Sequence, residues 1–127
     1  MIGQATYTNK ATGVRNAVTL PYGPGWYFLE RTYQVQTAGA AVTHQPLFYN
    51  ASVGPTVDTL IYESQDSAAG TNVVYNPADN LSQAQVGPLS RPFKSSDGSI
   101  YVDPGAIAPL GGETFSGRLI VRFVGRL

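Results

Sequence analysis

The sequence predicts an all-β protein, a single-domain β-sandwich or jelly roll of about seven or eight short antiparallel strands joined by long Pro/Gly-rich loops. Three observations predict it. Apolar and polar residues alternate along several segments, as they do in strands with one buried face. Turn residues, including 14 Gly and 9 Pro, separate these segments. No window of about twelve residues keeps a helical apolar stripe free of Gly and Pro.

The chain begins with a polar segment and continues as one domain. Residues 1–13 are rich in Thr, Asn and Gly, with Ile2 and Tyr7 as their large apolar side chains. We expect an N-terminal arm that is loose alone and orders on a partner, for instance by adding a strand to an exposed sheet edge. Residues 14–127 show no linker and no repeat, so we expect a single β-sandwich domain there, within the usual size of one domain.

Two strands are expected early in this domain. Residues 14–20 place Val14, Val18 and Leu20 on one face. A turn dense in Gly and Pro follows at 21–25 and leads into a strong strand at 26–36. Strict alternation along that strand gives one face Tyr27, Leu29, Tyr33 and Val35. The opposite face receives Trp26, Phe28, Glu30, Thr32, Gln34 and Gln36.

Shorter strands are expected at 46–50, 56–64, 72–76 and 99–103, with turn clusters between them. The Asp97-Gly98 pair before the last of these is typical of a hairpin turn, because both residues accept positive φ. The segment 79–86 has room for one helical turn. The stretch 78–112 is otherwise irregular yet retains apolar residues, which favours an ordered loop region packed on another surface.

The closing segment 113–125 has the clearest strand pattern of the chain. Its apolar face carries Phe115, Leu119, Val121 and Phe123, and its polar face carries Arg118 and Arg122. Such a strand buries one side and wets the other.

Composition excludes several classes of function. The chain has no Cys, which removes disulfides and thiolate chemistry. Its formal net charge is +0, with 8 basic and 8 acidic residues, so we expect neither nucleic acid nor an anionic membrane as partner. No signal peptide and no membrane-spanning segment are expected from the apolar runs.

No catalytic, cofactor-binding or metal-binding residues are predicted. His44 is the one imidazole, and no nucleophile motif accompanies it. Glu30 and Glu63 are the best carboxylate pair for glycoside hydrolysis, but each is more typical of a solvated strand face. Asp97 and Asp103, with the more distant Asp79, would be the ligands of a calcium site, but they lack a calcium-loop pattern.

Two kinds of binding surface remain. Tyr22, Trp26 and Tyr27 flank the Gly/Pro turn and form a candidate platform for a sugar ring, which keeps a lectin-like module as an alternative. The other alternative is a protein interface, since Tyr, Gln, Asn and Thr suit interfaces of mixed polarity. Its candidate contact residues are Ile2, Tyr7, Leu89, Phe93, Ile107, Leu110, Arg118 and Arg122.

In overall style the chain resembles small structural proteins of tailed-bacteriophage virions, above all capsid decoration or cement proteins of β-sandwich or jelly-roll type. The polar start at 1–13, the 21–25 turn before a Tyr-rich strand and the closing strand carry this resemblance. It implies a non-enzymatic virion protein, assembled in the host cytoplasm, that forms trimers and clamps neighbouring subunits of the major capsid protein. Tail and baseplate proteins share the same style and remain an alternative.

Overall fold

A computed structural model gives the fold of residues 1–64, 68, 73–75 and 92–127. Within these residues the chain forms short and long strands and one single-turn helix. In chain order these are β1 (Ile2–Ala11), β2 (Asn16–Thr19), β3 (Gly25–Ala38), β4 (Leu47–Tyr49), α1 (Thr56–Thr59), β5 (Leu60–Glu63), β6 (Val73–Tyr75), β7 (Phe93–Ser95), β8 (Ser99–Asp103) and β9 (Thr114–Gly125). The all-β prediction is therefore confirmed.

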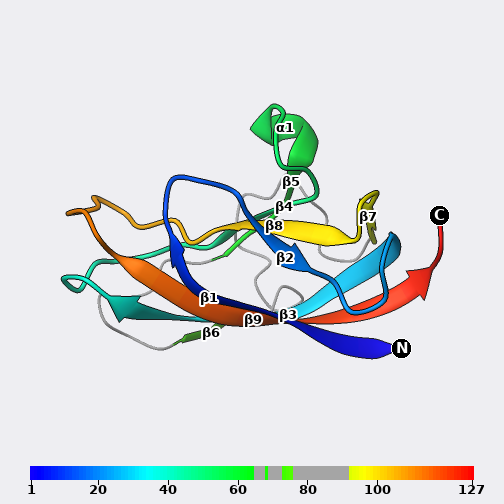
Figure 1. The fold of residues 1–127 in the computed structure, drawn as a ribbon, viewed down its shortest axis with the longest axis horizontal. Coiled ribbons are helices and arrows are strands. Elements are labelled where there is room, and N and C mark those ends of the chain that lie inside the picture. Colours follow the sequence, from blue (N-terminus) through cyan, green and yellow to red (C-terminus); the bar gives the residue numbers. More distant parts are fainter. Residues whose placement is uncertain (65–67, 69–72, 76–91) are drawn as a thin grey trace.

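The strands form two antiparallel sheets that pack as the layers of a β-sandwich (Figure 1). The larger sheet has the order β1-β9-β3-β6, and β7 also pairs with β3. β6 and β7 share the same edge of β3, β7 at Gly25–Tyr27 and β6 at Thr32–Gln34. The smaller sheet has the order β2-β8-β4-β5. Both termini lie at the same end of the larger sheet (Figure 1), where the amide of Phe123 donates to the carbonyl of Met1 at 2.7 Å.

The core lies between the two sheets and receives apolar side chains from both. β9 contributes Leu119 and Val121, and β8 contributes Ile100 and Val102, all fully buried. This confirms the apolar face predicted for the closing strand. A smaller cluster of Tyr49, Leu60 and Tyr101 is separate from this core. It is covered by Arg15, whose guanidinium lies 3.9 Å from the centre of the Tyr49 ring.

A β-bulge divides β3 into two halves that bury different kinds of residue. Leu29 lies opposite Val121 and Arg31 lies opposite Ile120, so Glu30 is an extra residue on β3. Because side chains alternate along a strand, one extra residue exchanges the two faces beyond it.

The predicted faces are therefore right before the bulge and wrong after it. Tyr27 and Leu29 are buried, as the alternation indicates, but the second half buries Thr32 and Gln34. Tyr33 and Val35, expected to share a face with Tyr27, point to the outer side of the larger sheet instead. The bulge also explains why two polar side chains lie in the interior.

The expected N-terminal arm is an edge strand of the protein's own domain. β1 pairs with β9 from Ile2 opposite Arg122 to Ala11 opposite Thr114. An irregularity between Tyr7 and Lys10 includes Asn9 with a φ of 51°, which bends the strand near its end. The alternation missed in this segment is real, since Ala5 and Tyr7 are buried between exposed threonines.

Two further expectations are corrected. The segment 56–64 is a strand in its second half alone, because Pro55 initiates the turn of α1 and the strand begins at Leu60. The Asp97-Gly98 turn is not a hairpin: it joins β7, which pairs with β3, to β8, which belongs to the other sheet. Gly98 does adopt a positive φ of 84°, and its carbonyl accepts the amide of Leu20 at 2.9 Å, which ties the corner to the smaller sheet.

The other expected strands correspond to β2, β4, β6 and β8. Within the irregular stretch 78–112, β7 was missed, and the possible helical turn at 79–86 lies outside the described residues. α1 has four residues, far fewer than a helix needs to cross a membrane, and it is the one helix of the described ranges.

Candidate functional site

The expected interface residues separate into surface and core. Ile2, Ile107 and Leu110 are exposed, by 61%, 42% and 73% respectively, and both arginines, Arg118 and Arg122, lie on the outer face of β9. Tyr7 and Phe93, by contrast, are buried in the main core. Leu89 lies outside the described residues.

The expected sugar platform does not form. Tyr27 is fully buried, its hydroxyl donates to the carbonyl of Gly23 at 2.7 Å, and its ring stacks on Phe93. Tyr22 packs on Phe123 and donates its hydroxyl to the carbonyl of Ile2. Tyr22 is partly buried, and Trp26 is the most exposed of the three, at 39%.

The acidic candidates are held by neighbouring protein groups. Glu30 forms an ion pair with Arg122, with Oε1 and Nε 2.7 Å apart, while Glu63 lies on β5 in the other sheet. Asp103 accepts hydrogen bonds from Thr12, Gly13 and Gly105. Asp79 lies outside the described residues, and no cluster of three potential metal-ligating side chains occurs among the described ones.

His44 belongs to a buried polar network that sequence alternation did not predict. Tyr7 donates its hydroxyl to Oε1 of Gln34 at 2.6 Å. The amide nitrogen of Gln34 then lies 2.7 Å from Nδ1 of His44 and 3.1 Å from the carbonyl of Pro104. His44 is fully buried and packs on Phe115.

Gly117 makes room for this network. In the sheet register, Tyr7 on β1 and Gln34 on β3 both lie opposite Gly117 on β9, so their side chains meet across it. A Cβ at this position would collide with the hydroxyl end of Tyr7 and with the carbonyl of Tyr33. The glycine is thus required by the close approach of Tyr7 to the strand.

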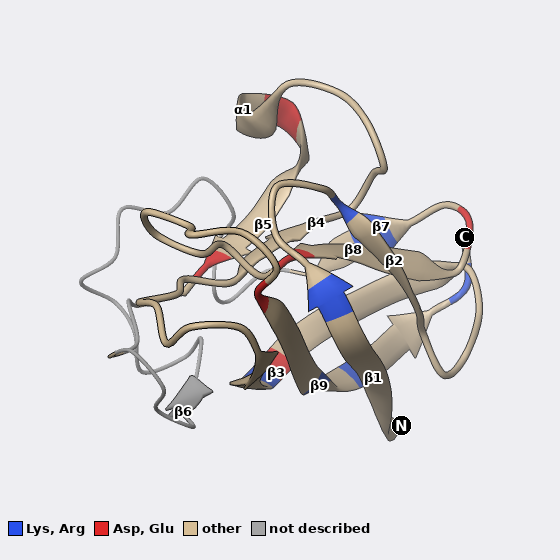
Figure 2. Ribbon diagram, turned by 60° about the vertical axis from the view of Figure 1, so that its left-hand side comes forward, with Lys and Arg blue, Asp and Glu red and all other residues tan. Residues whose placement is uncertain are grey.

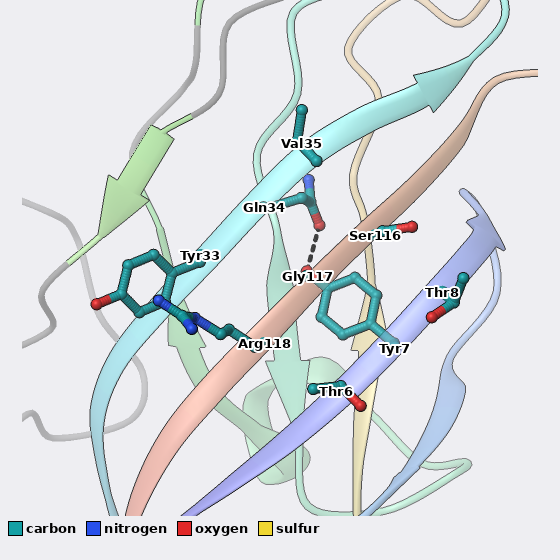
Figure 3. A pocket seen from close by; sticks show the side chains of 9 residues that line it. All are labelled: Thr6, Tyr7, Thr8, Tyr33, Gln34, Val35, Ser116, Gly117 and Arg118. Carbon is teal, nitrogen blue, oxygen red and sulfur yellow. Dashed lines mark hydrogen bonds between the residues drawn. The ribbon is translucent and has the colours of Figure 1, made fainter.

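On the outer face of the same three strands lies a hollow, which we call the Gly117 hollow (Figure 3). It is open to solvent and has a volume of about 530 Å³. Gly117, with Tyr7 and Gln34 beside it, lies in the middle of the lining. On each of the three strands, outward-facing residues lie before and after this central row: Thr6 and Thr8 on β1, Ser116 and Arg118 on β9, and Tyr33 and Val35 on β3.

Tyr33 and the two arginines beside it, Arg31 and Arg118, form the charged wall of the hollow. The guanidinium of Arg118 lies over the Tyr33 ring, 4.2 Å from its centre (Figure 3). The guanidinium of Arg31, placed to hydrogen-bond the Tyr33 hydroxyl, lowers the pKa of that hydroxyl. Desolvation partly opposes this effect, and Arg118 lowers the pKa further by a smaller amount. Both arginines therefore create a positive field at this wall.

Charge is otherwise scattered over several elements of the molecule (Figure 2). In the described ranges, the pair of Arg122 with Glu30 is the one salt bridge, so neither Arg31 nor Arg118 has a carboxylate within ion-pair distance there. The sequence pattern did identify Arg118 as an outward residue. It could not identify Tyr33 as its neighbour, because the bulge reverses the direction of Tyr33.

A second feature of the outer face is an apolar corner, formed by Ile2, Trp26, Phe28 and Val124, at the end of the sheet where the termini lie. Ile2 and Phe28 both lie opposite Arg122 in the register, Val124 is two residues further along β9, and Trp26 lies opposite Gly125. Trp26, Ile2 and Val124 are exposed by 39%, 61% and 53%.

Comparisons of the chain with protein-family models, with curated proteins and with solved structures each gave no match.

Proposed function

We propose that this protein is a non-enzymatic structural protein of a virion, of the decoration or cement type, which binds and stabilises neighbouring capsid subunits. The single observation that carries the proposal is the apolar corner, where Ile2, Trp26, Phe28 and Val124 are grouped around Arg122 on one face. Exposed apolar side chains that gather on one face, rimmed by polar residues, mark protein-binding surfaces. The corner contains Trp26 and includes the ion pair of Arg122 with Glu30. Trp and Arg are among the residues most enriched at positions that contribute most of the binding energy of an interface.

A second exposed apolar site lies at the opposite end of the molecule. The loop between β8 and β9 exposes Ile107 and Leu110, while Val124 lies near the far end of β9. Twelve strand residues at about 3.3 Å each separate the two ends of β9 by roughly 35–40 Å. Figure 1 shows this loop and the chain termini on opposite sides of the fold. Two binding sites so placed support a bridge between two neighbouring subunits.

Binding of this kind stabilises an assembly by mass action, because a protein that binds the assembled state alone shifts the equilibrium toward it. Low charge supports close approach of several copies, since only 13% of residues are charged. We therefore include self-association, with a trimer as the expected form, in the proposal.

We expect a major capsid protein to be encoded beside this gene, and the test uses shells assembled from that protein. Purified protein is expected to co-sediment with the shells and to raise their disruption temperature. Trp26→Ala and Val124→Ser are expected to weaken this binding at least tenfold. Val53→Ser is the matched control, because Val53 is 77% exposed but lies in the loop before α1, away from both apolar sites. A lack of binding to shells, or equal binding by all variants, would overturn the proposal, and binding to tails instead would replace the capsid with the tail as partner.

A further inference from the structure

The Gly117 hollow combines three chemical properties that the apolar corner lacks. One side carries the guanidinium of Arg118, which lies over Tyr33 on β3 and has no carboxylate partner among the described residues. The neighbouring side, toward β1, carries hydroxyl groups, with Thr6 directly opposite Arg118 in the register. Between the outward-facing residues, Tyr7 and Gln34 direct their side chains inward beside Gly117. A volume of about 530 Å³ lies within the range of small-molecule sites, about 300–1,000 Å³.

The arginine wall suits a single carboxylate. Arg118 is held in place by stacking on Tyr33, which leaves the edge of its guanidinium as a fork of N–H donors. A carboxylate accepts two parallel hydrogen bonds from such a fork, and this charge-assisted pair is among the stronger hydrogen bonds in proteins. The same two arginines lower the pKa of Tyr33, as expected where negative charge is favoured.

The hydroxyl wall suits a polyol. Thr6 and Thr8 are both exposed on the edge strand β1, where their side chains lie two residues apart on the same face. Ser116 accepts the amide of Asn9 at 2.9 Å, so its own hydroxyl proton points elsewhere and serves as a donor. Hydroxyls both donate and accept, which matches the mixed pattern of sugar hydroxyls.

We propose that the Gly117 hollow binds an acidic sugar, a pyranose ring bearing a carboxylate, with the carboxylate on Arg118 and the ring hydroxyls toward Thr6, Thr8 and Ser116. Val35 and the bare strand surface give the ring an apolar contact. This binding goes beyond the proposed capsid function and does not depend on it, since the hollow and the apolar corner are separate surfaces.

Other anionic ligands fit the wall less well. Nucleic acid binding relies on several cations along a backbone, whereas this wall offers two arginines on a chain of zero net charge. An acidic peptide would satisfy Arg118 but leave the three hydroxyl-bearing residues without matched partners. The hydroxyl wall is therefore the feature that favours a sugar.

The test is a titration followed by amide chemical shifts in ¹⁵N-labelled protein, with trigalacturonate as the probe. Shifts are expected to concentrate at residues 6–8, 33–35 and 116–118. The matched neutral sugar, galactotriose, and an acidic peptide, tetra-aspartate, are titrated in parallel. We expect each to bind at least tenfold more weakly than the acidic sugar. Equal binding of the neutral sugar, equal binding of the peptide, or shifts located elsewhere would overturn the proposal.

Variants separate the two walls. Arg118→Gln is expected to lower affinity for trigalacturonate at least tenfold, and Thr6→Val with Thr8→Val is expected to lower it severalfold without improving binding of the peptide. Arg126→Gln is the control, because Arg126 is an exposed arginine beyond the end of β9. Each variant is first shown to retain the thermal transition of the unmodified protein. Unchanged affinity in Arg118→Gln would contradict the proposal, while capsid binding by the same variant reports on the proposed function separately.

Discussion

The two halves of β3 form the same kind of strand in the same sheet but bury opposite kinds of side chain. Before the bulge, Tyr27 and Leu29 add to the main apolar core. After it, Thr32 and Gln34 are buried, and Gln34 links Tyr7 to His44. Both halves pair with β9, so the sheet continues across the bulge.

This difference shows that a single extra residue determines what a strand buries. The same bulge that brings Gln34 inward directs Tyr33 outward, where it supports Arg118 at the wall of the Gly117 hollow. The buried polar network and the candidate binding site thus have one structural origin. Four experiments test this comparison, and they are taken in order of expected effect.

Deletion of Glu30 removes the bulge and is expected to have the largest effect. The second half of β3 would then present Tyr33 and Val35 to the core and expose Gln34, while the ion pair with Arg122 is lost. We expect no cooperative thermal unfolding transition by circular dichroism. Deletion of Gly111, in an exposed loop where no atom lies within 4 Å of the position that a Cβ would take, is the control and is expected to leave the transition in place. A cooperative, wild-type-like transition in the Glu30 deletion would show that the bulge does not determine the buried face.

Gly117→Ala tests the packing beneath the polar half. Its methyl group would overlap Tyr7, so we expect a loss of about 2–3 kcal/mol in the free energy of unfolding, measured by urea titration. Gly125→Ala, on the same strand with no atom near its Cβ position, is expected to change stability by less than about 1 kcal/mol. Similar effects at the two glycines would argue against the close approach of Tyr7.

Tyr7→Phe removes one donor from the buried network. Oε1 of Gln34 would lose its hydrogen bond in a buried site, and we expect a cost of about 1–2 kcal/mol. Tyr22→Phe is matched to it, since the Tyr22 hydroxyl donates to a backbone carbonyl at the surface. We expect that change to cost less than about 0.5 kcal/mol, again by urea titration. If the two substitutions cost the same, the network does not contribute more than a surface hydrogen bond.

The smallest change in stability is expected at the Asp97-Gly98 turn, which follows β7 beside the apolar half of β3. The Tyr101 hydroxyl donates to Oδ2 of Asp97, which lowers the pKa of Asp97, and the same bond raises the pKa of Tyr101. The pKa of this carboxyl is lower in the folded protein than in the unfolded chain, where it lies near 4. The carboxylate therefore stabilises the fold at pH values above the unfolded-state pKa, and this stabilisation is lost as the pH falls through the folded-state pKa.

The stability difference between the unmodified protein and Tyr101→Phe is therefore expected to be present at pH 7 and to shrink toward pH 2.5. Tyr22→Phe is expected to show no such change with pH, because its acceptor is a backbone carbonyl. Urea titrations at the two pH values measure both differences. A Tyr101→Phe difference that is constant with pH would contradict the coupling to Asp97.

Most strands could be predicted because they depend on local patterns. β8 matches its expected range at both ends, and β9 differs from its own by one residue. β1 was missed because threonines and asparagine dilute its pattern, although Ala5 and Tyr7 do alternate inward. β7 has three residues, too few for a period to show.

Two residues that line the candidate site, Tyr7 and Arg118, were among the predicted contact residues, and Arg118 is the one that faces outward. Arg118 is outward in any register of a regular β9, so its exposure follows from the local alternation. Its neighbours Tyr33 and Thr6 come from strands about 85 and 112 positions away in sequence, and their meeting depends on pairing and on the bulge. No local pattern contains the position of that bulge, because the extra residue is defined by the partner strand opposite it.

The amino-acid sequence by itself determined the β class, the positions of most strands along the chain and the apolar face of β9, because alternation and turn residues act over a few neighbouring positions. Tertiary structure decided which residues of β3 are buried, that the first strand completes the larger sheet, and that Arg118 meets Tyr33 beside a hollow. These features depend on pairing between strands far apart in the chain, where packing against a partner, rather than local preference, selects the register.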